Sequence, residues 1–293
     1  MTVIASPLRY PGGKSCLLPL VSTIIRENKM QFCAYAEPYA GGCGLALELL
    51  FGAHVSEIHI NDLDPAIWAF WSSVLNNTEQ FIGLIENTSI SVEEWHNQKS
   101  IQKNLSNHTV IELGFSAFFL NRTNRSGIIK GAGMIGGLKQ EGNYKMDCRF
   151  NKEGLIRRIR RIKKYEDQIF LHNEDAVKFM KSSDKILPDG AFICIDPPYY
   201  NKGKSLYTSF YSPEDHAGVA EAVLNLKQPW IVTYDNVAPV AELYKTRRQF
   251  SFDINYSVQT KRIGTELLVA SKGLRIPKIL RERQFIQSKY KAA

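Results

Sequence analysis

The sequence predicts an α/β protein in which a largely parallel sheet carries helices on both faces and is interrupted by a helical insert. Short apolar runs alternate with helix-like segments near both ends of the chain, as in βαβ units. Three of these runs are followed or closed by an acidic residue, Glu37, Asp62 and Asp196. The middle of the chain has the period of successive helices instead. We therefore expect residues 1–65 and 169–293 to form the sheet domain and residues 66–168 to form an inserted domain.

Composition narrows the class of protein. The chain has 293 residues, 44% of them hydrophobic, which is enough for a sizeable core, and a net charge of +8, which favours a polyanionic partner. Its five cysteines include no C-x-x-C pair, so a reducing cytoplasm is the expected compartment. The six histidines do not cluster with cysteines at ligand spacing, so no metal is expected. No apolar run is long enough for a membrane span.

The N-terminal stretch 9–15 reads Arg-Tyr-Pro-Gly-Gly-Lys-Ser and has the look of a phosphate loop. A P-loop requires glycine five positions before its Gly-Lys pair, and Leu8 occupies that place. What remains is a glycine turn whose Lys14 can meet a carboxylate, followed by a helix over residues 16–26. Glycines in such a turn let the backbone approach a ligand closely.

Residues 32–50 predict a strand, a glycine-rich turn and a helix, which is the first half of a nucleotide-binding βαβ unit. The turn lacks the G-x-G-x-x-G pattern, so it suits a ligand without phosphates. The second strand is expected at residues 55–60, and Asp62 after it is our candidate for holding ribose hydroxyls. Asp64 is the reserve, although Asp64-Pro65 is better explained as a helix N-cap.

The insert is predicted to contain several helices, one of them opened by a capping box at Ser91 and another over residues 107–120. Residues 121–137 form a polar, glycine-rich stretch with a literal G-x-G-x-x-G from Gly131 to Gly136. No strand precedes that pattern, so we reject a dinucleotide site and expect a basic binding loop. The helix over residues 155–164 has six cations in eight positions, which indicates either a solvated face or a phosphate-contacting surface.

The second half of the sheet begins with a strand at residues 168–172, after which Asp175 either accepts a hydrogen bond from a cofactor's adenine amine or caps the next helix. Further strands are expected at 192–195, 230–236, 250–256 and 267–271, and Ser212 opens a helix.

The run at 192–195 reads as a strand buried on both faces, which places Asp196 at its carboxyl end. Pro197 and Pro198 stiffen the following loop, and Tyr199 adds an aromatic face. Such a set of acceptors suits a planar group with an exocyclic amine, such as a base rotated out of a duplex.

In order along the chain stand Y-P-G-G-K, A-E-P-Y-A-G-G-C-G, N-D-L-D, the insert, N-E-D, D-P-P-Y and W-I-V-T-Y-D-N. This order resembles the Dam-type N6-adenine DNA methyltransferases over nearly the whole chain. The resemblance implies a Rossmann-like S-adenosylmethionine-dependent sheet with an inserted target-recognition domain. It also implies that the cofactor contacts Tyr10, Lys14, Asp62, Asp196 and the turn that contains Glu37, Pro38 and Gly41. The catalytic residues it implies are Asp196, Pro197, Pro198 and Tyr199.

The activity implied is transfer of a methyl group from S-adenosylmethionine to N6 of a flipped adenine in double-stranded DNA. We expect DNA to be contacted by cationic residues of the insert, Arg122, Arg125, Lys130, Arg157, Arg158, Arg160 and Arg161. The loop departs from relatives that read GATC, because Ser126-Gly127-Ile128 and Lys130 stand where those have Asn-Gly-Leu and Arg. Three alternatives stay open: an N4-cytosine DNA methyltransferase, an RNA amino-methyltransferase and a catalytically silent binding protein. A cognate restriction or defence nuclease as partner also stays open.

Overall fold

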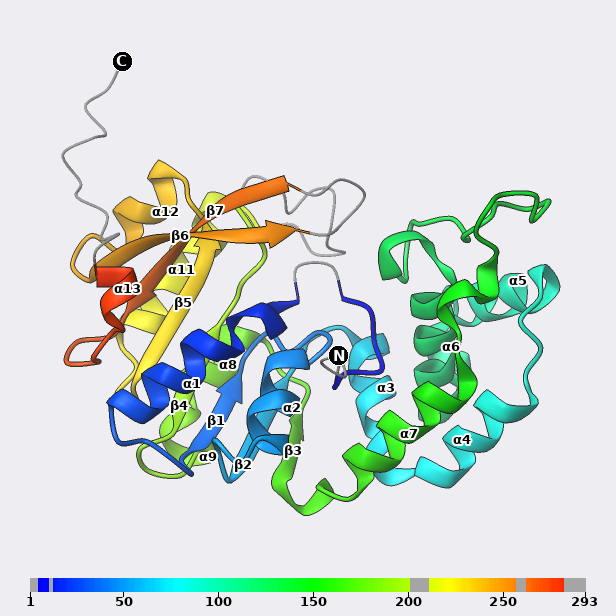
Figure 1. The fold of residues 1–293 in the computed structure, drawn as a ribbon, viewed down its shortest axis with the longest axis horizontal. Coiled ribbons are helices and arrows are strands. Elements are labelled where there is room, and N and C mark those ends of the chain that lie inside the picture. Colours follow the sequence, from blue (N-terminus) through cyan, green and yellow to red (C-terminus); the bar gives the residue numbers. More distant parts are fainter. Residues whose placement is uncertain (1–4, 11–12, 201–210, 257–261, 282–293) are drawn as a thin grey trace.

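The computed structural model describes residues 5–10, 13–200, 211–256 and 262–281 (Figure 1). Within them, seven strands form one sheet in the order β3-β2-β1-β4-β5-β7-β6. Strands β1 to β5 are parallel, whereas β7 runs antiparallel to both of its neighbours. The strands are β1 Ala34–Glu37, β2 Glu57–Asn61, β3 Ile169–His172, β4 Phe192–Ile195, β5 Trp230–Asp235, β6 Arg248–Tyr256 and β7 Arg262–Ala270.

The strand order reverses between β1 and β4, which lie side by side in the middle of the sheet. The chain winds outward from β1 toward β3 and from β4 toward β6. At such a reversal the connections leave in opposite directions and open a crevice at the carboxyl ends of the strands, where ligands bind. Glu37, the last residue of β1, and Asp196, directly after β4, both stand at this crevice.

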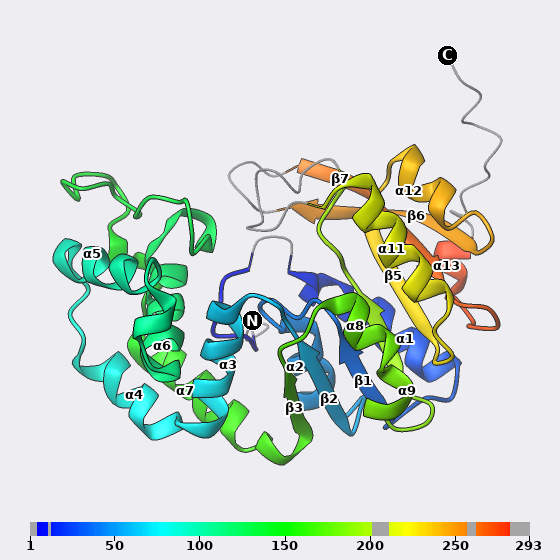
Figure 2. The same ribbon diagram turned by 180° about the vertical axis from the view of Figure 1, so that it is seen from behind.

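Strands β1 and β4 are buried on both faces, as the apolar run at 192–195 predicted. Their alternate side chains enter two separate cores: Tyr35 and Phe192 enter one, and Ala36 and Ile193 enter the other. Figure 1 and Figure 2 show helices on the two faces of the sheet. The helices packed on the first core are η1 Lys14–Leu17, α1 Leu18–Glu27 and α2 Gly44–Phe51, and those on the second are α8 Ala176–Lys181, α9 Ser183–Ile186, α11 Pro213–Leu224 and α12 Ala238–Leu243.

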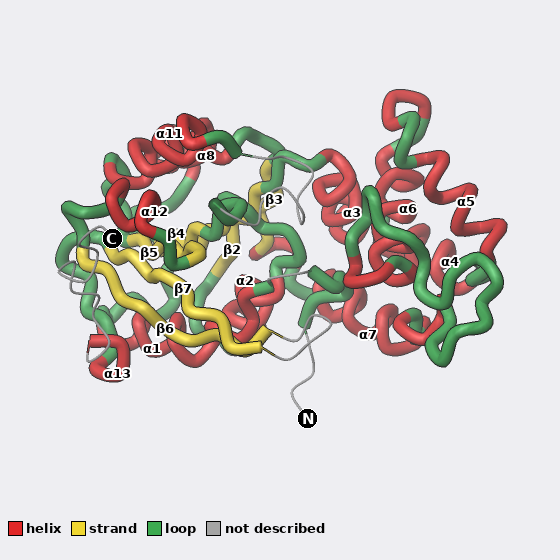
Figure 3. The backbone as a smooth tube through the Cα atoms, turned by 90° about the horizontal axis from the view of Figure 1, so that it is seen from above, coloured by secondary structure: helices red, strands yellow, loops and turns green. Residues whose placement is uncertain are grey.

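The insert forms a group of helices beside the sheet (Figure 3). Its side chains continue the core of the α2 face, where Trp71 and Phe118 are fully buried. One cluster of buried residues joins the sheet to the insert. The division of the chain into a sheet domain and an inserted domain over residues 66–168 therefore remains a proposal. The helices are α3 Pro65–Asn76, α4 Thr78–Asn87, α5 Val92–Ile101, η2 Leu105–Asn107, α6 Val110–Thr123, η3 Arg125–Gly127, η4 Met146–Arg149, α7 Lys152–Lys163 and η5 Glu166–Gln168; α13 Lys278–Arg281 follows the sheet.

Several local predictions are confirmed. The Ser91 and Ser212 side chains accept hydrogen bonds from the backbone N–H groups of Glu94 and Asp215, which makes each serine a helix N-cap. The capping box expected at Ser91 is incomplete, because the Glu94 side chain accepts from Asn97 and Gln98 instead. Strands β6 and β7 extend beyond their predicted ranges, because antiparallel pairing continues past the apolar runs that sequence reading detects. None of the described helices combines the length and apolar character needed to cross a bilayer. The sequence predicts a polar and aromatic loop over residues 201–211, after the D-P-P-Y motif, and most of it lies outside the described residues.

The α3–α6 contact generates a first prediction. A Cβ atom on Gly114 of α6 would lie 2.5 Å from both the Ala69 carbonyl and the Ser73 hydroxyl of α3. We predict that Gly114→Ala forces the helices apart and lowers the free energy of unfolding by about 1–3 kcal/mol. The matched control is Gly83→Ala in α4, where nothing lies within 4 Å and stability should stay level or rise by up to about 1 kcal/mol. Urea denaturation measures both, and equal effects would contradict the close packing.

Candidate active site

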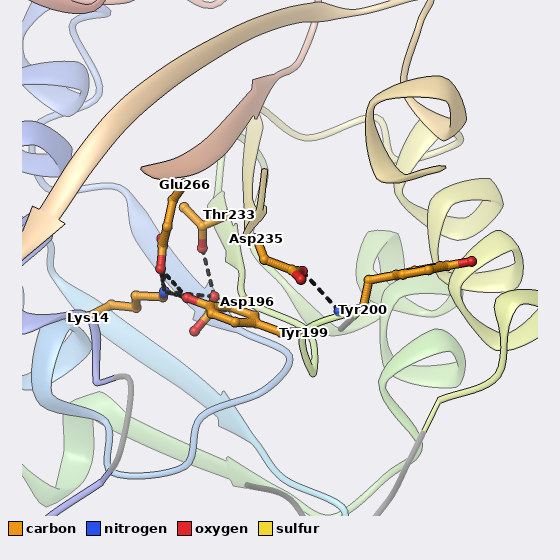
Figure 4. Close-up of polar contacts among 7 residues, drawn as sticks. All are labelled: Lys14, Asp196, Tyr199, Tyr200, Thr233, Asp235 and Glu266. Carbon is orange, nitrogen blue, oxygen red and sulfur yellow. Dashed lines mark hydrogen bonds and ion pairs between the residues drawn. The ribbon is translucent and has the colours of Figure 1, made fainter. Parts of the chain in front are cut away.

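Asp196 projects from the carboxyl end of β4 into a network of polar side chains (Figure 4). Thr233 of β5 donates a hydrogen bond of 2.8 Å to Asp196 Oδ1. The Lys14 ammonium lies 3.2 Å from the same oxygen. One carboxylate oxygen is therefore held from two directions, which fixes the plane of the carboxyl group.

The Lys14 ammonium is shared among several acceptors. Besides Asp196, its Nζ donates to the Tyr199 hydroxyl at 2.6 Å and to Glu266 Oε1 and Oε2 at 3.2 and 3.1 Å. The Tyr199 hydroxyl in turn donates to Glu266 Oε1. The prediction that Lys14 meets a carboxylate is confirmed, and two carboxylates share it.

The loop after Asp196 is held rigidly at its far end. Asp235, at the end of β5, accepts a hydrogen bond of 2.9 Å from the Tyr200 backbone N–H. Tyr199 is only 4% exposed, and its hydroxyl is bonded as described above. A base can stack on Tyr199 only after the face of its ring is uncovered.

The predicted cofactor residues of the first half gather around the turn after β1. Asp62 Oδ2 accepts from the Gly41 N–H at 2.8 Å, and Asp62 Oδ1 accepts from the Asp64 N–H at 2.9 Å. Gly41 has a φ of +48°, and a Cβ there would lie 2.6 Å from the Tyr10 ring, so the glycine permits this close packing. The Pro38 carbonyl accepts from the Asn61 side chain at 3.0 Å.

Three carboxyl groups near the crevice have raised pKa values because they are buried. Burial raises the pKa of Glu37 to about 8, against the effect of the Tyr35 hydroxyl that donates to it. Burial also raises the pKa of Asp62 to about 6 and that of Asp196 to about 6, the latter against the effect of Lys14. Buried acids of this kind become fully charged more easily when a cation is placed beside them. Carboxyl groups with raised pKa values at these strand ends are compatible with a cationic ligand.

Asp64 and Asp175 both cap helices. Asp64 accepts from the Ala66 N–H at 2.9 Å at the start of α3, and the exposed Asp175 accepts from the Lys178 N–H at 3.1 Å at the start of α8. The capping explanation given for each from the sequence is confirmed. A contact between Asp175 and a cofactor's adenine is compatible with its exposure and remains a proposal.

The predicted binding loop of the insert is tied to the segment that leads into Lys14. The Asn121 side chain accepts from the Arg9 N–H and donates to the Arg9 and Gly127 carbonyls, each at 2.7 Å. Lys130 lies 3.7 Å from Asp64, at the carboxyl edge of the sheet. Arg125 is exposed on this loop. The loop thus lies beside the crevice rather than at a remote surface.

Arg122 is not available for reading bases. It is 9% exposed, and its guanidinium donates to the Arg149 carbonyl at 2.7 Å and to the Pro7 carbonyl at 3.4 Å. Burial, followed by the repulsion of nearby arginines, lowers its pKa to about 9. We therefore correct its expected role from guanine recognition to attachment of the N-terminal segment to the insert.

The arginines of α7 do not form one surface. Arg157 lies 3.4 Å from Glu153, and Arg158 donates to the Ser6 carbonyl at 3.1 Å, near the glycine turn. Arg161 instead covers the Phe51 ring at 4.1 Å, and Arg160 lies 3.8 Å from Glu79 in the first turn of α4. Phe51 is the last residue of α2, and Glu79 follows the end of α3. Both helices run away from the edge of the sheet at which the parallel strands end. Arg160 and Arg161 are exposed, so their contact with DNA stays a prediction, and we propose that the DNA surface is centred on Arg157 and Arg158 instead.

Sequence reading missed several residues of the site, notably Glu266, Thr233 and Asn121. The available signal was a polar residue within an apolar strand: Glu266 directly precedes Leu-Leu-Val-Ala, and Thr233 interrupts Trp-Ile-Val. Among the described residues, no group of three or more histidine, cysteine or acidic side chains is arranged to hold a metal ion.

The strand order with its single antiparallel strand, and the acidic residues at the carboxyl ends of β1 and β4, define a Rossmann-like α/β sheet. A family model narrows the class of protein. It matches residues 10–262, and the chain belongs to the family that it describes, the D12 class N6 adenine-specific DNA methyltransferases.

The solved structures that match this chain include two structures of the rRNA methyltransferase aviRa from Streptomyces viridochromogenes. The first shares 14% identity at a TM-score of 0.38, covering 92% of this chain and 90% of that one. The second shares 14% identity at a TM-score of 0.33, covering 85% and 82%. A likeness at this level carries no inference about the substrate. No curated protein sequence matches.

The bond from Thr233 to Asp196 generates a second prediction. Hydrogen bonding to a carboxylate lowers its pKa, so Thr233→Val should raise the pKa of Asp196 above about 6. We expect the acid limb of the pH profile of single-turnover methyl transfer to move upward by about one pH unit. The control is Thr78→Val, which removes a hydroxyl bonded to the Val74 carbonyl in the insert. If both variants keep the wild-type profile, Thr233 does not tune Asp196.

Proposed function

We propose that the protein methylates N6 of an adenine rotated out of duplex DNA. The observation that supports this best is the Asp196 carboxylate, held by Thr233 and Lys14 at the strand reversal and followed by two prolines. Membership of the D12 class family supports adenine and DNA as the substrate. The net charge of +8 fits a polyanion.

The residues around the crevice fit S-adenosylmethionine. When bound, this cofactor supplies a methyl group activated by its sulfonium. Asp62 and Asp196, whose pKa values are raised to about 6, supply negative charge near neutral pH. Glu37, whose pKa is raised to about 8, would ionise once a cation lay beside it. Asp62 would hold the ribose hydroxyls, and the turn with Pro38 and Gly41, covered by the Tyr10 ring, would line the methionine side. The exposed Asp175 would receive the adenine amine.

The target amine requires activation, because its lone pair is delocalised into the purine ring. The Asp196 carboxylate and the Pro197 carbonyl would accept hydrogen bonds from the two N–H groups of this amine. These hydrogen bonds would favour the tetrahedral amine of the transition state. Tyr199 would stack on the base once its ring is uncovered, a contact worth roughly 1–3 kcal/mol. The rigid loop through Pro198 keeps these groups in register, so positioning supplies much of the remaining acceleration.

DNA would lie across the loop that contains Arg125 and Lys130, which is attached beside the crevice through Asn121. Arg125 and Lys130 are the candidates for reading bases. Arg157 and Arg158, in the middle of α7, would contact phosphates; Arg158 already lies beside the N-terminal segment, where it donates to the Ser6 carbonyl.

The direct test is methylation of duplex DNA, followed by mass spectrometry of its nucleosides. We expect N6-methyladenine from the wild type and a loss of at least ~100-fold in turnover for Asp196→Ala, because an acceptor for the transition state is removed. Asp62→Ala should act mainly on the affinity for S-adenosylmethionine, because a ribose contact is made before and during transfer. N4-methylcytosine as the product, methylation of RNA alone, or wild-type turnover by Asp196→Ala would overturn the proposal.

The loop and the helix generate a separate prediction. Arg125→Ala should reduce discrimination between the preferred site and its single-base variants by about 1–3 kcal/mol while nonspecific binding changes little. Arg158→Ala should weaken binding to all sequences and reduce the salt dependence by the equivalent of about one phosphate. Arg160→Ala, on another side of α7 where the guanidinium lies 3.8 Å from Glu79, is the matched control and should change neither. Salt-titrated binding and sequencing of methylated sites measure these effects; unchanged sequence preference in Arg125→Ala would contradict the assignment.

A further inference from the structure

Glu266 is a buried carboxylate on β7 that no motif of the sequence singled out. It is 1% exposed and contacts two residues of the site, the Lys14 ammonium and the Tyr199 hydroxyl. Both contacts appear in Figure 4, where the Glu266 carboxylate points toward the Lys14 ammonium and the Tyr199 hydroxyl. A buried carboxylate without a cation would be costly, so Glu266 and Lys14 depend on each other.

The ammonium of Lys14 has three N–H donors, and these reach Asp196, Tyr199 and Glu266. If Glu266 lost its charge, Asp196 would be the remaining carboxylate among the described contacts of Lys14. The Asp196 carboxylate would then be engaged more strongly by the protein and would be a weaker acceptor for another amine. Glu266 thus sets how much of the lysine charge acts on Asp196.

We propose that Glu266 is a positioning residue for methyl transfer. Because Glu266 shares the Lys14 ammonium with Asp196, the Asp196 carboxylate stays able to accept hydrogen bonds from the N–H groups of the target amine. This inference rests on the function proposed above for Asp196. Glu266 also holds the Tyr199 hydroxyl, and through it the orientation of the ring that would meet the base.

The electrostatics of the site support this role. Burial raises the pKa of Asp196, Lys14 lowers it, and Glu266 raises it again. Other groups also interact with Asp196, and they remain unchanged when Glu266 alone is replaced. The titratable groups that interact with Asp196 are Lys14 and Cys16 of the N-terminal segment, Glu37 of β1, Cys194 of β4, Tyr234 of β5 and Glu266 of β7.

The test is Glu266→Gln, which keeps the shape of the side chain and an oxygen for the Tyr199 hydroxyl but removes the charge. We expect turnover near neutral pH to fall by about tenfold to a hundredfold. The acid limb of the pH profile should move downward by about one pH unit, because the pKa of Asp196 falls when the repulsion of Glu266 is removed. This shift is opposite in sign to that of Thr233→Val. The dissociation constant for S-adenosylhomocysteine, measured by calorimetry, should change by less than about threefold.

A purely structural role would lower thermal stability and leave the pH profile in place, and that result would overturn the inference. Glu266→Asp retains the negative charge, so its turnover should exceed that of Glu266→Gln and its acid limb should match that of the wild type. Equal pH profiles for Glu266→Asp and Glu266→Gln would also overturn the inference. If Glu266→Gln does not fold, the double variant Glu266→Gln/Lys14→Gln removes both charges and should fold. We expect this double variant to be inactive. Wild-type turnover by the double variant would refute the proposed role of Glu266. Glu242→Gln, in an exposed ion pair with Lys245, is the control.

The outcome is separable from that of the proposed function. If the wild type methylates no DNA adenine, the proposed function fails whatever Glu266 does. If the wild type methylates DNA adenine and Glu266→Gln keeps its turnover and acid limb, only the role of Glu266 fails.

Discussion

The Lys14 ammonium, shared by the Asp196 and Glu266 carboxylates, is the interaction on which the rest of the site depends. It joins three parts of the chain: the N-terminal segment, the end of β4 and strand β7. Charges buried in this way are stable only when they are paired and hydrogen-bonded, so the three parts must assemble together. Tyr199 enters the same network through its hydroxyl, and the proline loop between Asp196 and Tyr199 is thereby held at both ends.

The same N-terminal segment connects the site to the insert. The carbonyl groups of Ser6, Pro7 and Arg9 accept hydrogen bonds from Arg158, Arg122 and Asn121 respectively. A few residues later the segment reaches Lys14. The N-terminal segment therefore contacts both the loop proposed to read bases, through Arg9, and the carboxylate proposed to receive the amine, through Lys14. This connection explains why the charged Arg122 side chain is buried, because its guanidinium bonds the N-terminal segment to the insert.

The acidic residues at the strand ends give the crevice its chemical character. Burial alone would favour their neutral forms, and the raised pKa values of Glu37 and Asp62 reflect this. Partial compensation comes from donors already in place, the Tyr35 hydroxyl for Glu37 and the Gly41 N–H for Asp62. A cation in the crevice would complete the compensation, which is why the fold and the proposed cofactor suit one another. Specific recognition of an uncharged ligand would leave the same carboxyl groups poorly solvated.

The sequence by itself determined the strands of the parallel sheet, the caps at Ser91 and Ser212 and the position of Asp196, because apolar periodicity and turn residues act over a few neighbours. The order of its motifs also identified the family. Only the tertiary structure decided which charged residues meet. Lys14 and Glu266 are 252 residues apart, Arg122 is buried by backbone from two distant segments, and Arg161 lies over the Phe51 ring at the end of α2. Local patterns record a residue's charge but not its partner, because partners are fixed by how distant elements pack.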